Sequence, residues 1–110
     1  MANTFKNSVS NSIGTSSTDV YTTPSATTTT VIGATVSNRT SSVIEVDVSV
    51  TDTSSGTTAF LVKAAPVPVG SSIVVVGGDQ KIVLETSDVI SVVSDTASSA
   101  DVIISVLEQS

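Results

Sequence analysis

Apolar and polar residues alternate with a period of two along most of the chain after Asp19, which is the pattern of strands with one buried face. In the stretch VIEVDVSV, Ile and Val occupy one face, while Glu45, Asp47 and Ser49 occupy the other. Turn-forming Pro, Gly, Ser and Asp residues separate eight such stretches, at 18–23, 28–37, 43–51, 57–63, 71–76, 80–85, 88–94 and 100–107. The pattern therefore predicts about eight short strands.

The amino-acid composition also favours strands over helices. β-Branched Val, Ile and Thr make up 45 of the 110 residues, whereas Leu occurs three times and Ala eight times. The connections between the predicted strands are too short for parallel crossovers, which need about a dozen residues or more. We therefore predict an all-β fold, a single antiparallel β-sandwich for which a jelly roll is one candidate arrangement.

The first 17 residues are polar and rich in Ser, Thr and Asn. Phe5, Val9 and Ile13 are the few apolar anchors of this segment. We predict an extended N-terminal arm at 1–17 and a β-sandwich domain at 18–110. Such an arm rarely becomes ordered in isolation, so we expect a neighbouring subunit to hold it.

Two of the predicted strands are apolar on both faces. Val74, Val76, Val89 and Val93 cannot share a face with the Ile and Val residues that alternate with them. Either an arm of the same chain or another subunit has to cover the second face, and a sandwich of 110 residues has little spare chain. We expect a homo-oligomer. The predicted assembly interface comprises Phe5, Val9, Ile13, Val74, Val76, Val89 and Val93.

Three short segments rich in Gly, Pro or Asp predict turns and edges. Gly77 and Gly78 stand between two predicted strands, where a hairpin turn needs positive φ; a phosphate-binding loop would open a helix instead. Pro66 and Pro68 cannot donate to a sheet ladder, so they indicate a connection or a sheet edge rather than an SH3 ligand. The segment ETSD at 85–88 predicts a tight turn in which the Asp accepts hydrogen bonds from local amides.

Charge and apolar run length restrict the partners. The formal net charge is −6, and the four basic residues are scattered, so we expect no nucleic-acid binding. The longest apolar run, IVVV at 73–76, is far shorter than a membrane span, and we expect no membrane association. The first residues carry no apolar secretory core, so we expect the chain to be made and used without Sec export, and the absence of Cys gives no sign of an oxidising compartment.

Candidate catalytic residues are few. The chain has no His and no Cys, which removes the imidazole base and the thiolate nucleophile. A Ser–Lys pair would be possible by chance, but no motif fixes its geometry. Glu45 and Asp47 share a strand face, about 6 to 7 Å apart, near the spacing of an inverting glycosidase. Since charges on an alternating strand usually form a solvated face, we predict no catalytic residue and no cofactor.

Acidic loop residues are the one candidate source of metal ligands. Asp52, Asp79, Asp95 and Asp101 are dispersed along the chain, and no segment has the spacing of a twelve-residue calcium loop. Carboxylates from neighbouring turns could still meet around a calcium ion. The sequence itself assigns no metal site.

Four segments carry a resemblance to a known group of proteins: TDVYTTPSATTTTVIGATVSN, AFLVKAAPVPVGSS, GGDQKIVLETSDVI and DVIISVLEQS. Together they cover most of the range from Thr18 to Gln109, and they resemble small virion structural proteins of tailed bacteriophages. The chain departs from that pattern at Ser87, where Gly is expected before Asp88. The resemblance implies a β-sandwich unit on the surface of a virion.

The function expected from this resemblance is structural. A capsid decoration or cement protein that bridges major capsid subunits, as a homo-oligomer, is our first expectation. A neck, collar or tail-surface component is the alternative in the same class. A host-surface or carbohydrate-binding module on the virion, and a small hydrolase, belong to other classes; the first of these would call for surface aromatic residues or a calcium site.

Overall fold

The structure is a computed structural model that describes residues 2–110 and measures 45 × 26 × 22 Å. Its nine strands are β1 (Asn3–Ile13), β2 (Thr18–Thr22), β3 (Thr28–Asn38), β4 (Ile44–Asp52), β5 (Thr57–Val67), β6 (Ser72–Val76), β7 (Ile82–Leu84), β8 (Val89–Ser94) and β9 (Ala100–Gln109). Residues 2–110 include no helix that is long and apolar enough to cross a membrane.

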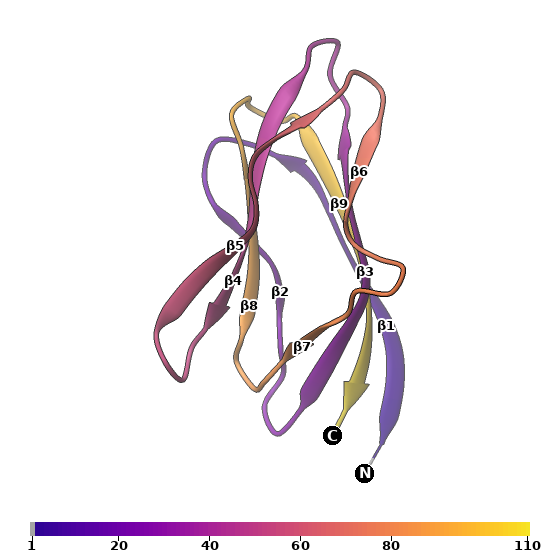
Figure 1. Ribbon diagram of the computed structural model, residues 1–110, viewed down its shortest axis with the longest axis vertical. Helices are drawn as coiled ribbons and strands as arrows, with labels where there is room; N and C mark the ends of the chain where they lie inside the picture. The colour runs from indigo at the N-terminus through magenta and orange to yellow at the C-terminus, as the bar shows by residue number, and fades with distance from the viewer. Residues whose placement is uncertain (1) are drawn as a thin grey trace.

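The strands form two antiparallel sheets that pack face to face (Figure 1). Sheet A has the order β1-β9-β3-β6, with β7 also paired to β3, and sheet B has the order β2-β8-β4-β5. The pairs β1–β9, β2–β8, β3–β6 and β4–β5 are nested along the chain, as if one long hairpin had been folded over, which is the jelly-roll arrangement. The predicted antiparallel β-sandwich is therefore confirmed.

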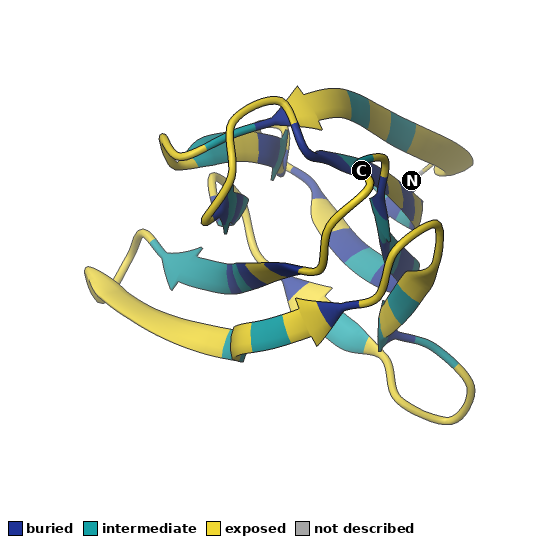
Figure 2. Cartoon of the chain, turned by 90° about the horizontal axis from the view of Figure 1, so that it is seen from above, coloured by how far each residue is buried: buried dark blue, intermediate teal, exposed yellow. Residues whose placement is uncertain are grey.

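The core lies between the two sheets and follows the alternation of the sequence. Buried and exposed positions alternate along the inner strands, whereas the edge strands β1 and β5 are mostly exposed (Figure 2). In β4, Ile44, Val46 and Val48 are buried while Glu45 is exposed, as predicted. Every strand places at least one apolar side chain in the core, and each fully buried Val or Ile is worth about 1.5–3 kcal/mol.

The N-terminal segment differs from the prediction of an arm held by a neighbour. Residues Asn3–Ile13 form β1, which pairs with β9 of the same chain from Asn3↔Gln109 to Ile13↔Ala100. Main-chain hydrogen bonds to β9, rather than apolar anchors, order this polar stretch. The segment is thus the first strand of the jelly roll rather than an arm outside the sandwich, and pairing within its own chain accounts for its order.

The predicted hairpin at Gly77 and Gly78 is also wrong. β6 and β7 do not pair with each other; both pair with β3, β6 along Ala34–Ser37 and β7 along Thr29–Val31. The two strands therefore form one interrupted edge of sheet A. A turn closed by a hydrogen bond of 3.2 Å from the Gln80 amide to the Gly77 carbonyl separates them, and Gly78 supplies the expected positive φ of 63°.

The other two turn and edge predictions are confirmed. Pro66 lies in β5, which is an edge strand of sheet B and extends beyond the predicted 57–63. At 85–88 the Asp88 amide donates to the Glu85 carbonyl at 3.0 Å, and the Glu85 amide donates to Oδ2 of Asp88 at 2.9 Å. Ser87 adopts a φ of 71° in this turn, a conformation that favours Gly.

Candidate assembly interface

The outer face of sheet A carries two rows of side chains, each of which crosses four strands. The first row crosses β1, β9, β3 and β7 and consists of Phe5, Leu107, Thr30 and Val83. The second row crosses β1, β9, β3 and β6 and consists of Val9, Ile103, Thr35 and Val74. We call the apolar members of these rows, Phe5, Val9, Val74, Val83, Ile103 and Leu107, the apolar face.

Most of the apolar face is open to solvent. Exposure is 75% for Phe5, 64% for Val9, 70% for Val74, 63% for Val83 and 52% for Ile103, so five of the eight exposed large apolar side chains among residues 2–110 lie here. A shallow hollow of about 350 Å³ lies against this face, bordered by Phe5, Ile32 and Ser105. Asn7 and Ser105 form a polar pair between the two rows, so the face is a cluster of exposed apolar side chains, and such clusters typically mark an interaction site.

The apolar face is nearly free of charge. Of the described strand residues that point outward from sheet A, Asp101 is the one acidic residue near the rows, and Arg39 binds it at 3.3 Å. The outer side of sheet B, in contrast, carries Glu45 and Asp47 on β4 and Asp19 on β2. The sandwich therefore has an apolar outer side and an acidic one.

Three of the seven predicted interface residues lie on the apolar face: Phe5, Val9 and Val74. Phe5 and Val9 lie on one edge strand of sheet A and Val74 on the other, and strand pairing places all three on the same face of the sheet. The sequence prediction missed Val83, Ile103 and Leu107, although the apolar residues on both faces of DVIISVL are the same signal that selected the others.

Two predicted interface residues belong to the core of their own chain instead. Ile13 is buried at the end of β1, and Val76 is buried at the end of β6. A β-bulge lies where Ala34 pairs with Val76 but Thr35 pairs with Val74. Because a bulge inserts one residue, Val74 and Val76 face opposite sides despite their even spacing.

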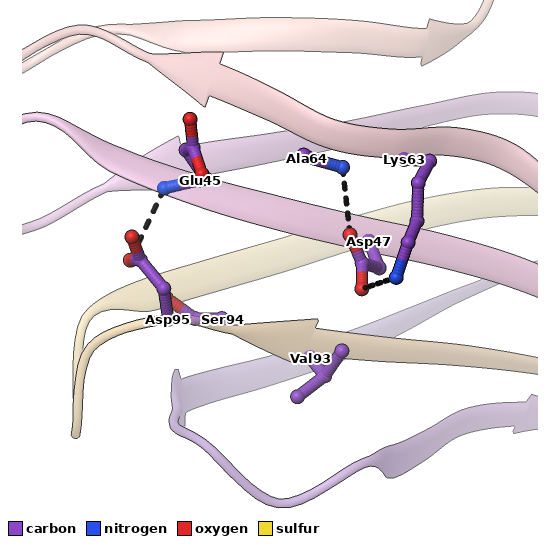
Figure 3. Close-up of a pocket in the computed structure, with 7 residues that line it drawn as sticks. All are labelled: Glu45, Asp47, Lys63, Ala64, Val93, Ser94 and Asp95. Atoms are coloured by element: carbon purple, nitrogen blue, oxygen red, sulfur yellow. Dashed lines mark hydrogen bonds and ion pairs between the residues drawn. The ribbon is translucent and has the colours of Figure 1, made fainter.

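Val89 and Val93, the last two predicted residues, are partly buried and point outward from sheet B. Val93 lines an open hollow of about 230 Å³ beside β4 and β5 (Figure 3). Because Glu45, Asp47, Lys63 and Asp95 also line it, we call it the acidic hollow. The seven predicted residues are thus divided among the apolar face, the core and the acidic side.

The acidic hollow contains the two carboxylates considered for glycosidase chemistry. Asp47 accepts hydrogen bonds from the Ala64 amide at 2.7 Å and from Lys63 Nζ at 2.9 Å, whereas the Glu45 carboxylate makes none of the contacts drawn in Figure 3. The Ala64 amide, and then Lys63, hold the pKa of Asp47 below its usual range. A glycosidase general acid needs a raised pKa, so this arrangement does not favour that chemistry.

The loop acids named above do not converge. Among the described residues Asp79 lies in the exposed β6–β7 turn, Asp95 accepts from the Glu45 amide at 3.1 Å, and Asp101 pairs with Arg39. Asp52 does meet two other carboxylates, but these belong to Glu85 and Asp88.

Tyr21 is the one Tyr of the chain, and its side chain points between the sheets. Its hydroxyl donates to Oε2 of Glu108 at 2.6 Å and shares a hydrogen bond of 2.8 Å with Oγ1 of Thr29, while Lys6 binds Oε1 of Glu108 at 3.2 Å. Burial, and then the hydrogen bond with Glu108, raises the pKa of Tyr21 to about 12. The same hydrogen bond lowers the pKa of Glu108. Tyr21 thus links sheet B to sheet A and offers no open platform for a sugar ring.

Comparisons with protein-family models, with curated proteins and with solved structures found no match for this chain.

Proposed function

We propose that this chain is a non-enzymatic structural subunit that assembles with copies of itself through the apolar face. The observation that carries this proposal is the pair of exposed apolar rows that cross sheet A from β1 to β6 and β7. Two sheets that pack face to face are about 10 Å apart, which removes such rows from water. This burial stabilises the complex by about 25 cal/mol per Å² of apolar surface.

The charge distribution favours the apolar face as the side through which two copies meet. Two molecules with a formal net charge of −6 repel each other wherever their acidic sides meet. The apolar face adds almost no charge to the contact, since Arg39 neutralises Asp101 at its margin. A two-fold pairing of apolar faces therefore leaves Glu45 and Asp47 in solvent on both copies.

The larger assembly that we propose is a bacteriophage virion, with the chain as a decoration or cement protein bridging major capsid subunits. The resemblance of the four segments between Thr18 and Gln109 motivates this assignment, and a jelly roll is compatible with it because viral capsid proteins use that fold. Fold alone does not determine function, so a neck, collar or tail-surface location remains the alternative within the same proposal.

The self-assembly part is tested by placing a charge on the apolar face. Ile103 is exposed at the middle of one row, so Ile103→Asp should fold normally yet shift the protein to monomer in sedimentation velocity. Val43→Asp is the matched control, since Val43 is 60% exposed but lies outside both rows. A wild-type protein that stays monomeric at high concentration, or an Ile103→Asp protein that associates like wild type, would refute the proposal.

The virion part has a separate test. Copy number in purified particles should reach hundreds for a decoration protein, and a dozen or fewer for a neck or tail component. Imaging of particles that lack the protein should show a fragile head with an intact tail if it cements the capsid. Its absence from purified particles would refute the assignment while leaving self-assembly intact.

A further inference from the structure

Three carboxylates converge at the end of the sandwich where β4 and β7 end and β8 begins. Asp52 comes from the last position of β4, while Glu85 and Asp88 come from the turn between β7 and β8. Oxygens of the three side chains lie within 4.8 Å of one another. In Figure 1 the β7–β8 connection and the end of β4 lie in the lower half of the molecule.

Backbone amides and the Ser54 hydroxyl hold two of these carboxylates, those of Asp52 and Asp88, in place. Asp88 accepts from the Glu85 amide at 2.9 Å and from the Thr53 amide at 3.2 Å, so it ties the two turns together. Asp52 accepts from the hydroxyl of Ser54 at 2.7 Å and from its amide at 3.1 Å. The Ser54 hydroxyl is the main reason why the pKa of Asp52 lies below its usual value. Each Asp88 oxygen accepts one of these bonds and keeps a second lone pair, and Oδ2 of Asp52 accepts none of them.

A buried hydroxyl beside the cluster lacks a partner. Thr23 Oγ1 is the one buried side-chain polar atom among residues 2–110 without a hydrogen bond, and Thr23 is 2% exposed. The Thr23 amide donates to the Asp88 carbonyl at 2.9 Å, so the two residues stand opposite each other in the extension of the β2–β8 pair. Tyr21 and Ile90, the pair two positions earlier, point into the sandwich, and by the alternation of strands Thr23 and Asp88 point to that same side. The Thr23 side chain, with its unpaired hydroxyl, therefore lies on the same side of the sheet as the Asp88 carboxylate.

Within residues 2–110, no basic side chain balances the negative charge of the cluster. The four Lys and Arg residues bind elsewhere: Lys6 to Glu108, Arg39 to Asp101, Lys63 to Asp47 and Lys81 to the Gly78 carbonyl. Carboxylate and hydroxyl oxygens are ligands for hard cations, and oxygens within 4.8 Å of one another are close enough to share one Ca²⁺. Ca²⁺ accepts the irregular geometry of such a site more readily than Mg²⁺, which demands a near-ideal octahedron.

We infer that Asp52, Glu85, Asp88 and the Thr23 hydroxyl form a calcium site that joins the β4–β5 and β7–β8 turns. Water fills the remaining positions of the six to eight that Ca²⁺ takes. The ion supplies Thr23 Oγ1 with the partner that the protein does not provide, and it stabilises the folded state by mass action.

The test measures thermal unfolding of the full chain after chelation, with CaCl₂, MgCl₂ or NaCl of matched ionic strength. Ca²⁺ well above its Kd should raise the midpoint by about 5 °C or more, and Mg²⁺ by much less. Asp52→Asn and Glu85→Gln should lose the calcium shift, although the amide oxygen introduced by Asp52→Asn can still accept the hydrogen bonds of the turn. Glu45→Gln, an exposed acid in the other hollow, should keep the shift.

Thr23→Val separates a ligand from a structural residue. Without Ca²⁺, loss of an unpaired buried hydroxyl should leave the midpoint unchanged or higher, whereas the calcium shift should shrink. Isothermal titration with CaCl₂ should report weaker binding for the same variant. The inference is overturned if wild type responds to CaCl₂ no more than to NaCl. It is also overturned if Asp52→Asn and Glu85→Gln keep the full shift, or if Thr23→Val does.

Discussion

Tyr21→Phe removes a hydroxyl that connects the two sheets near the chain ends. The hydroxyl serves two buried partners in sheet A, Thr29 and Glu108, at 2.8 and 2.6 Å. A hydrogen bond to a charged group contributes about 1.5–3 kcal/mol, and a buried group left without a partner costs about 1–3 kcal/mol. Because Lys6 remains bound to Glu108, we expect Tyr21→Phe to lower the free energy of unfolding by about 2–4 kcal/mol at pH 7.

The pKa shifts of Glu108 and Tyr21 predict how the stability lost in Tyr21→Phe changes with pH. The hydrogen bond from Tyr21 lowers the pKa of Glu108 below the unfolded value of 4.5, so its contribution is complete above pH 4.5 and is lost as the pH falls through the folded pKa. Wild type and Tyr21→Phe should therefore converge in acid. The pKa of Tyr21 rises from 10.0 to about 12 in the folded protein, so wild type should lose stability between those values while Tyr21→Phe does not.

Urea unfolding followed by far-UV circular dichroism, repeated across this pH range, measures both effects. Ser91→Ala is a suitable control because it removes a hydrogen bond of 2.8 Å to Asp19 at an exposed position, where the cost is small. If Tyr21→Phe costs no more than Ser91→Ala at pH 7, or if its deficit is the same in acid, then this network does not stabilise the fold as the geometry indicates.

Three smaller predictions concern a turn, the core and a surface ion pair. Ser87→Gly should raise the free energy of unfolding by about 1 kcal/mol, seen as a higher urea midpoint, because Ser87 has a φ of 71°; a lower midpoint would contradict this. Ile104→Val should cost about 0.5–1.5 kcal/mol in the same assay, since Ile104 is fully buried, and an unchanged midpoint would show that the core tolerates the cavity. Asp47→Asn should cost less than about 1 kcal/mol, because Lys63 is largely exposed and Asn still accepts from the Ala64 amide; a loss as large as that of Tyr21→Phe would be inconsistent with solvent screening.

Alternation in the sequence predicted the strands because each strand of the domain has one face in the core. The alternation could not reveal which strands pair with each other. The N-terminal strand, for example, is ordered by backbone hydrogen bonds to β9, which leave no trace in its polar side chains. The β-bulge in β6, opposite Ala34 and Thr35, is also invisible in the sequence. It breaks the period of two, so Val74 and Val76 point to opposite faces of sheet A.

The candidate sites were predictable to different degrees. Phe5, Val9 and Val74 were selected because they are apolar residues without an evident core position, and all three lie on the apolar face. Of the acidic cluster only Asp52 was named from the sequence as a possible metal ligand. Glu85 and Asp88 were missed, because they meet Asp52 only through two turns that are distant in sequence. An unpaired Thr23 hydroxyl is likewise invisible in a chain with 17 Thr residues.

The nested pairing of β1 with β9 has a consequence for how the protein reaches its native state. Asn3 pairs with Gln109, and the inner pairs β2–β8 and β3–β6 also join distant parts of the chain, so closing each of them costs loop entropy before any contact forms. Topologies dominated by such pairings fold in milliseconds to seconds. During synthesis β1 cannot pair with β9 until β9 has left the ribosome. Until then the edges of β1 and β3 that pair with β9 remain exposed and can pair with other chains, which favours aggregation.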